Sequence, residues 1–167
     1  AQIAALTTKQ IAALTKIQAG AFTTANIQAL ASNQLSAMTT AAIIGLATHV
    51  FAAIETGDLA GLTTKQVGVF TKAQLRALTT AQAIALTTAQ IQALTVDQVP
   101  NLLTAQVAAL LDTQVAALQT ADLVTLTDAQ VKALTTSVNR MVAGLLLGRV
   151  LRTRIAISQE PRRFILA

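Results

Sequence analysis

The side chains with the greatest capacity for chemistry are few and isolated in this sequence. The single histidine, His49, lies in LATHVFAAI, at a position that is normally alanine. No second His or Cys stands at ligand spacing from it, so we expect a structural role instead of a metal site. Glu55 and Asp58 lie in the degenerate stretch IETGDLAGL, which favours a divergent turn over an acid–base pair. Neither stretch predicts catalysis.

Other candidate motifs also have simpler structural explanations. Gly57 and Gly61 are not followed by the Gly-Lys-Ser/Thr sequence of a phosphate-binding loop. Asp97, Asp112 and Asp128 lie near predicted helix starts, where the helix dipole favours negative charge. The chain has no cysteine, which excludes disulfides and thiolate chemistry. We therefore expect no catalytic, cofactor-binding or metal-binding residue, no cofactor, no small-molecule substrate and no enzymatic activity.

The net positive charge is concentrated at the C-terminal end. Residues 1–139 carry six basic and six acidic groups, whereas the last 28 residues carry six arginines and one glutamate. Apolar residues in this tail have helical spacing, so residues 138–167 are predicted to contain an amphipathic helix that caps the main body or mediates assembly. The candidate contacts to another subunit, an acidic partner or a membrane surface are Arg149, Arg152, Arg154, Arg162 and Arg163.

The elements that would position any site follow an eight-residue period. Large apolar residues occupy every eighth position from Leu6 to Leu134, 17 in all, and we call them the leucine series. A second set, the isoleucine series, runs at the same interval from Ile3 to Val131. The consensus octad is T-T-A-Q-I-x-A-L. A continuous helix would rotate such a pattern by roughly 80° per octad, so the chain must break in every octad.

Each octad contains a signal for starting a new helix. In LTTAQI, the Thr side chain can accept the backbone N–H three residues later, and the Gln side chain can reach back to the Thr backbone, as in a capping box. Leu86, Thr87, Gln90 and Ile91 fill the positions of this box and of its hydrophobic staple. A β-solenoid is the competing architecture, but strands favour β-branched and aromatic residues over Ala and Gln.

These patterns predict an all-α fold. Residues 1–137 are expected to form a solenoid of very short capped helices with an eight-residue repeat, in which both apolar series point inward. The pattern drifts where Leu103, Leu111 and Gln119 replace the capping Thr. Either the next residue in each octad becomes the cap, or two octads fuse into a longer helix.

The composition limits the class of protein. The chain has 167 residues and is 53% apolar, yet no apolar run approaches the roughly 20 residues that a membrane-spanning helix needs. The sequence starts in the middle of an octad, which suggests a processed product or a piece of a longer array.

Two resemblances follow from these octads. LTTAQIQAL and LTDAQVKAL resemble the helix opening of TAL-effector DNA-binding repeats, although the base-reading loop of that family has no counterpart here. Residues 1–137 resemble the LTTxQ(I/V)xAL octapeptide arrays of large bacterial repeat proteins, which are often secreted. The second resemblance implies a structural or surface role in the extracellular space or at the cell surface, with a cytoplasmic location still open.

The expected function is that of a non-enzymatic structural repeat protein. It would act as a scaffold or as a subunit that stacks end to end into fibres or tubes, without specific nucleic-acid binding. A membrane surface is a potential partner only through the basic tail. The alternative is a binding module that presents a repetitive Thr/Gln surface to a polymer, a partner protein or a surface.

Overall fold

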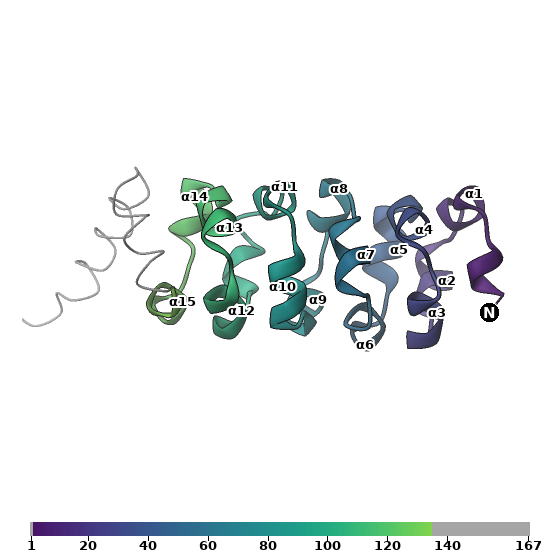
Figure 1. The fold of residues 1–167 in the computed structure, drawn as a ribbon, viewed down its shortest axis with the longest axis horizontal. Helices are drawn as coiled ribbons and strands as arrows, with labels where there is room; N and C mark the ends of the chain where they lie inside the picture. Colours follow the sequence, from purple (N-terminus) through teal and green to yellow (C-terminus); the bar gives the residue numbers. More distant parts are fainter. Residues whose placement is uncertain (1, 135–167) are drawn as a thin grey trace, which may run out of the picture.

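The computed structural model describes residues 2–134 and shows an elongated rod of short helices that wind around its long axis (Figure 1). No strand occurs among these residues, so the predicted all-α solenoid is confirmed and the β-solenoid is excluded for residues 2–134. The C-terminal segment 138–167, with its predicted amphipathic helix and its five candidate arginines, lies outside the described residues. In residues 2–134 no helix has the length and apolar character needed to cross a membrane.

Each helix occupies one octad. The elements are η1 (Ile3–Ala5), α1 (Thr8–Ala12), α2 (Lys16–Gly20), α3 (Thr24–Gln28), α4 (Ser32–Ala37), α5 (Thr40–Gly45), α6 (Thr48–Phe51), α7 (Thr56–Ala60), α8 (Thr64–Val67), α9 (Lys72–Ala77), α10 (Thr80–Ala85), α11 (Thr88–Gln92), η2 (Val99–Asn101), α12 (Thr104–Ala109), α13 (Asp112–Ala117), α14 (Thr120–Leu123) and α15 (Asp128–Ala133).

The predicted capping box starts most of these helices. At α11 the Thr87 hydroxyl accepts a hydrogen bond from the Gln90 N–H at 3.2 Å, and the Gln90 Oε1 accepts one from the Thr87 N–H at 2.8 Å. The preceding helix, α10, ends because Leu86 and Thr87 are both extended. No described residue adopts a positive φ, so these helices end without the left-handed glycine that often satisfies terminal carbonyls. Those carbonyls need another donor.

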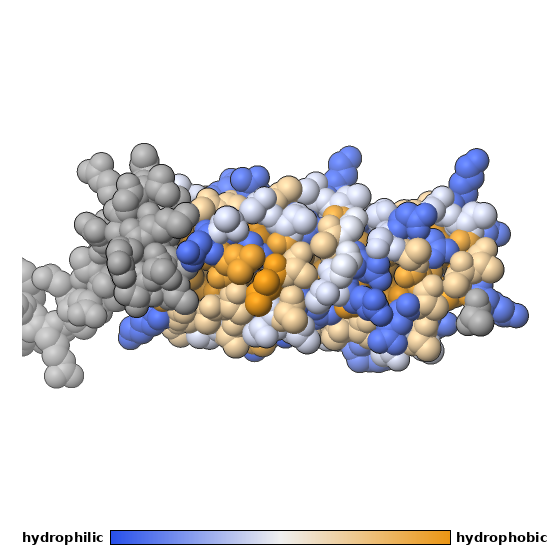
Figure 2. All heavy atoms as spheres, viewed as in Figure 1, coloured by the Kyte–Doolittle hydropathy of each residue, from blue (hydrophilic) through white to orange (hydrophobic). Residues whose placement is uncertain are grey.

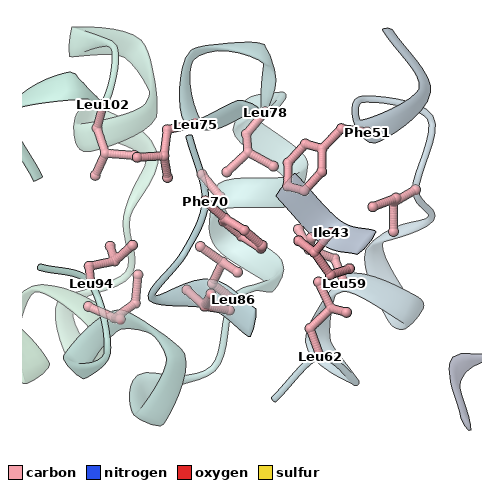
Figure 3. Close-up of a cluster of buried hydrophobic side chains, with 14 of the residues drawn as sticks. Ile43, Phe51, Leu59, Leu62, Phe70, Leu75, Leu78, Leu86, Leu94 and Leu102 are labelled. Atoms are coloured by element: carbon pink, nitrogen blue, oxygen red, sulfur yellow. The ribbon is translucent and has the colours of Figure 1, made fainter. Parts of the chain in front are cut away.

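The two apolar series form the core of the rod, as predicted. The isoleucine series is buried from Ile11 onward, and the leucine series is buried from Phe22 to Leu134. Side chains of successive turns contact one another in this core (Figure 3), where the rings of Phe51 and Phe70 pack edge to face with centroids 4.8 Å apart. Because the series continue without interruption, the core runs along the whole described rod.

Helices three octads apart pack against each other, as α2 does against α5 and α12 against α15. A close approach occurs at Gly45 in α5, where a Cβ atom would lie 2.3 Å from the backbone oxygen of Lys16 in α2. The amide contacts described below reach just under four octads back. One superhelical turn therefore takes between three and four octads.

The drift between residues 100 and 119 does not change the register of the helices. α12 and α13 begin at their usual positions after Leu103 and Leu111, so the cap does not move one residue later and the octads do not fuse. Both expectations are wrong because half of the capping box persists. Gln106 Oε1 accepts from the Leu103 N–H at 2.6 Å, and Gln114 Oε1 accepts from the Leu111 N–H at 2.8 Å.

Candidate functional site

The capping glutamines form a polar series inside the rod. Nine of them are buried, and we call them the glutamine ladder: Gln34, Gln66, Gln74, Gln82, Gln90, Gln98, Gln106, Gln114 and Gln130. The capping role predicted for these side chains is therefore only part of what they do. The expected Thr/Gln surface is wrong for the glutamines of the ladder.

Gln90 shows how one ladder side chain joins two turns. Its Oε1 caps its own helix, α11, while its Nε2 donates to the backbone oxygens of Leu59, Ala60 and Leu62 at 3.0, 3.1 and 2.7 Å. These oxygens lie at the end of α7 and directly after it. A primary amide has an acceptor and two donor hydrogens, so Gln90 satisfies the N-terminus of one helix and the C-terminus of another.

The same connection recurs along the rod. Every ladder glutamine donates from Nε2 to the carbonyl of the leucine-series residue 28 positions earlier, at 2.6–3.2 Å. The donor–acceptor pairs are Gln34–Leu6, Gln66–Met38, Gln74–Leu46, Gln82–Ile54, Gln90–Leu62, Gln98–Phe70, Gln106–Leu78, Gln114–Leu86 and Gln130–Leu102. A leucine-series residue thus contributes its side chain to the core and its backbone oxygen to the ladder.

Two octads replace the ladder glutamine with an apolar residue. Ala42 and Val50 occupy the position and are fully buried. The tight contact between α2 and α5 at Gly45 lies in the first of these octads. Direct backbone packing therefore takes the place of the amide there.

Asp122 is the ladder position with the most unusual electrostatics. Its side chain is 2% exposed, and its Oδ2 accepts a hydrogen bond from the Gln119 N–H at 3.1 Å. Burial raises the pKa of the Asp122 carboxyl, and the Gln119 N–H opposes that rise in pKa. An ionised carboxylate cannot donate to the carbonyl of Leu94, 28 residues earlier. The side-chain amide of Gln119 instead donates to the backbone oxygen of Gln92 on that turn, at 3.1 Å.

The residues with potential for chemistry do not assemble into a site. His49 is exposed on α6, and Glu55 precedes α7 without accepting a cap hydrogen bond from it. Asp58 accepts a hydrogen bond from the Ser32 hydroxyl of α4, so it connects two turns. Within residues 2–134, no three His, Asp or Glu side chains form a group suited to a metal ion.

An exposed apolar patch lies beside the ladder. Ile84 is 39% exposed and Leu111 is 50% exposed. Gln114 brings their backbones close together, because its Nε2 donates to the Ile84 oxygen and its Oε1 accepts from the Leu111 N–H. Figure 2 shows apolar surface in this region, between α10 and α13. The ladder and this patch are two features of the described residues that bear on function.

The ladder role of glutamine was missed from the sequence, although a signal for it was present. A capping box accepts Glu as readily as Gln at this position. From residue 10 to residue 130 the chain has Gln at 11 of these 16 positions and Glu at none. Only the amide supplies a donor in addition to the capping acceptor, so this preference indicates a partner for the N–H groups.

Among the comparisons with known proteins, only the family models gave a match, and it concerns the repeat. A search of curated proteins and a search of solved structures each gave no match. The family model described as the ALTTAQ repeat matches residues 51–88 and 73–104. The chain is therefore similar to the ALTTAQ repeat family over residues 51–104, in agreement with the predicted octapeptide array of LTTxQ type.

Proposed function

We propose that this repeat protein is a non-enzymatic scaffold, a rod that associates with copies of itself end to end. The observation that supports the proposal is the glutamine ladder. In the glutamine ladder, most of the buried polar side chains of the described residues join successive turns and do not line a cleft with reactive groups. The buried amides of the described residues thus stabilise the contacts between turns.

The geometry suits a spacer whose length follows the number of octads. Each added octad repeats the same core contacts and the same amide-to-carbonyl bonds, so stability grows by nearest-neighbour terms. Within residues 2–134 each turn packs on its neighbours through these contacts, and stacking of two copies would repeat them. End-to-end association is the interaction that this construction favours.

The proposed location is the extracellular space or the cell surface, on the basis of the resemblance to arrays in bacterial proteins that are often secreted. Fractionation of the producing cells, with detection of the chain in each fraction, tests this location. Recovery of the chain only from the cytoplasm would contradict it.

Sedimentation velocity and electron microscopy test self-association. We expect the average mass to rise with protein concentration and elongated particles to appear in the images. A monodisperse monomer at the highest soluble concentration would refute the proposal. Catalytic turnover that is lost on replacing His49 or Glu55 would refute its non-enzymatic part.

A binding module is the second candidate, and the exposed patch of Ile84 and Leu111 favours it. Leu111 stands where most octads have a capping Thr, and it is an exposed apolar residue. The loss of the cap lowers stability, so stability does not explain why leucine is present here. This candidate predicts a chain that stays monomeric when concentrated. The same sedimentation experiment therefore separates it from the scaffold.

A further inference from the structure

The exposed apolar patch of Ile84 and Leu111 has a negative charge at its border. Asp112 follows Leu111 directly, is exposed, and stands in the first turn of α13. It also lies 28 residues after Ile84, which is the interval that separates ladder partners such as Gln114 and Leu86. The surface therefore presents two apolar side chains with a carboxylate beside them. We call Ile84, Leu111 and Asp112 the docking patch.

The described part of the chain ends beside this patch. α12 packs against α15 (Figure 1). Gln130, in the first turn of α15, donates to the carbonyl of Leu102, which stands two residues before α12, so the two helices start side by side and run in the same direction. Leu111 lies two residues after the end of α12, and Leu134 lies one residue after the end of α15. The residues that follow Leu134 therefore start close to Leu111.

The sequence that follows has the complementary chemistry. Residues 135–159 contain four arginines and no carboxylate. Arg149 stands four residues after the last member of an apolar stripe with helical spacing, which consists of Val138, Met141, Val142 and Leu145. An apolar stripe that ends in a guanidinium thus matches a patch of two apolar side chains and a carboxylate.

We propose that residues 138–149, which lie outside the described residues, dock on the docking patch of their own chain. The apolar stripe covers Ile84 and Leu111, and the Arg149 guanidinium pairs with the Asp112 carboxylate. Val138 is four residues after Leu134, and four residues reach up to about 13 Å. This reach exceeds the roughly 8–10 Å between packed helices, so the same chain can supply the segment.

The docked segment accounts for the residue type at position 111. Most octads have a capping Thr there, whereas Leu111 leaves α13 with the bond to Gln114 Oε1 alone. An exposed leucine adds nothing to the rod, and it stabilises the protein only where another apolar surface covers it. The inference does not depend on end-to-end association. It gives the patch an occupant within the chain, in place of the partner that a binding module needs.

Disulfide trapping in the full chain tests the contact. The chain has no cysteine, so Ile84→Cys can be combined with Met141→Cys or with Leu145→Cys. The matched control carries Val96→Cys in place of Ile84→Cys. Val96 is 44% exposed, compared with 39% for Ile84, and lies 12 residues further along, almost half of the 28-residue ladder interval. It therefore faces a different side of the rod.

We expect mild oxidation to close an internal disulfide in at least one patch pair about tenfold faster than in either control pair, because docking holds the two thiols together. Non-reducing gels and mass spectrometry of the monomer measure the rate. Equal rates in patch and control pairs would overturn the proposal. Disulfide-linked dimers in place of the internal disulfide would also overturn it, because they would assign the patch to a second copy.

Hydrogen exchange measured by mass spectrometry gives a readout without any cysteine. We expect the amides of residues 138–149 to be protected in the wild type and to exchange about tenfold faster in Leu111→Thr, which removes an apolar contact of the docked segment. The control Val96→Thr should leave their protection unchanged. The rod stays folded in both variants, because the segment and the rod open separately.

Both experiments are carried out at concentrations where the chain is monomeric, so a failure of self-association does not affect them. Exchange of these amides at the rate of an unfolded chain in the wild type would contradict docking. Protection that survives Leu111→Thr would contradict the assignment to this patch.

Discussion

Replacement of Gln90 by glutamate tests the ladder most directly, because an ionised carboxylate can still cap the helix but cannot donate across the turn. In the wild type, Gln90 is 2% exposed and its Nε2 lies 2.7–3.1 Å from three backbone oxygens. An ionised glutamate at this position would direct negative charge at those oxygens. We expect the new carboxyl to take up a proton instead, because its protonated form retains both an acceptor and a donor.

The free-energy cost follows from that proton. Holding a carboxyl of ordinary pKa about 4.3 in its neutral form at pH 7 costs about 3.7 kcal/mol, at about 1.36 kcal/mol per pH unit. The lost second donor adds about 1 kcal/mol. We therefore expect Gln90→Glu to lower the free energy of unfolding by about 3–5 kcal/mol at pH 7. Because the folded-state pKa is raised, this loss should shrink to about 1 kcal/mol as the pH falls to about 4.

The matched control is Gln10→Glu. Gln10 has the same capping box, but it is exposed and has no cross-turn acceptor within residues 2–134. Glutamate at this helix position is a normal capping-box residue, so we expect a change within about 0.5 kcal/mol at either pH.

Urea denaturation followed by circular dichroism at pH 7 and pH 4 provides the measurement, at concentrations where the chain is monomeric. Equal m-values among the wild type and both variants ensure that the midpoints compare the same transition. Equal losses for Gln90→Glu and Gln10→Glu would refute the ladder. So would a loss at Gln90 that does not depend on pH.

Three further predictions concern positions that depart from the octad pattern. Asp122→Gln should stabilise the chain by about 1–3 kcal/mol at pH 7 by restoring an amide donor. Because burial raises the pKa of Asp122, the stability contributed by the protonated carboxyl is complete below pH 3.8 and is lost as the pH rises through the folded-state pKa. Asp122→Gln has no such group, so its melting temperature should change less with pH over this range than that of the wild type. Gly45→Ala should lower the free energy of unfolding by about 1–3 kcal/mol, because the new Cβ would collide with the Lys16 oxygen. Gly57→Ala places no atom within 4 Å of the new Cβ and should stabilise α7 by about 0.5–1 kcal/mol. Leu111→Thr should raise the free energy of unfolding by about 0.5–2 kcal/mol, because it completes the capping box of α13. Denaturant midpoints measure the effects of Leu111→Thr and of both glycine variants.

The local part of this fold could be predicted from the sequence because its determinants lie within a few residues. Thr87 and Gln90 are three positions apart, so the start of α11 is a short-range property. The burial of both apolar series follows from the same period.

The cross-turn partners could not be predicted in this way. The distance of 28 residues between Gln90 and Leu62 depends on how tightly the superhelix winds, and that depends on contacts such as Gly45 against Lys16. The error at Leu111 has a related cause. The prediction took the loss of the Thr hydroxyl to shift or remove the cap, whereas the bond from the Leu111 N–H to Gln114 Oε1 keeps the register without that hydroxyl.

The 28-residue span of the ladder also determines how the exposed side chains are arranged around the rod. Because 28 residues are three and a half octads, consecutive turns are out of step by half an octad. The same octad position returns to the same side of the rod only after seven octads, which are two turns. The exposed basic residues in the described part of the chain obey this interval, in the pairs Lys9 and Lys65, Lys16 and Lys72, and Arg76 and Lys132. The rod therefore has a two-turn surface lattice, in which each of these pairs places two positive charges on the same side of the rod.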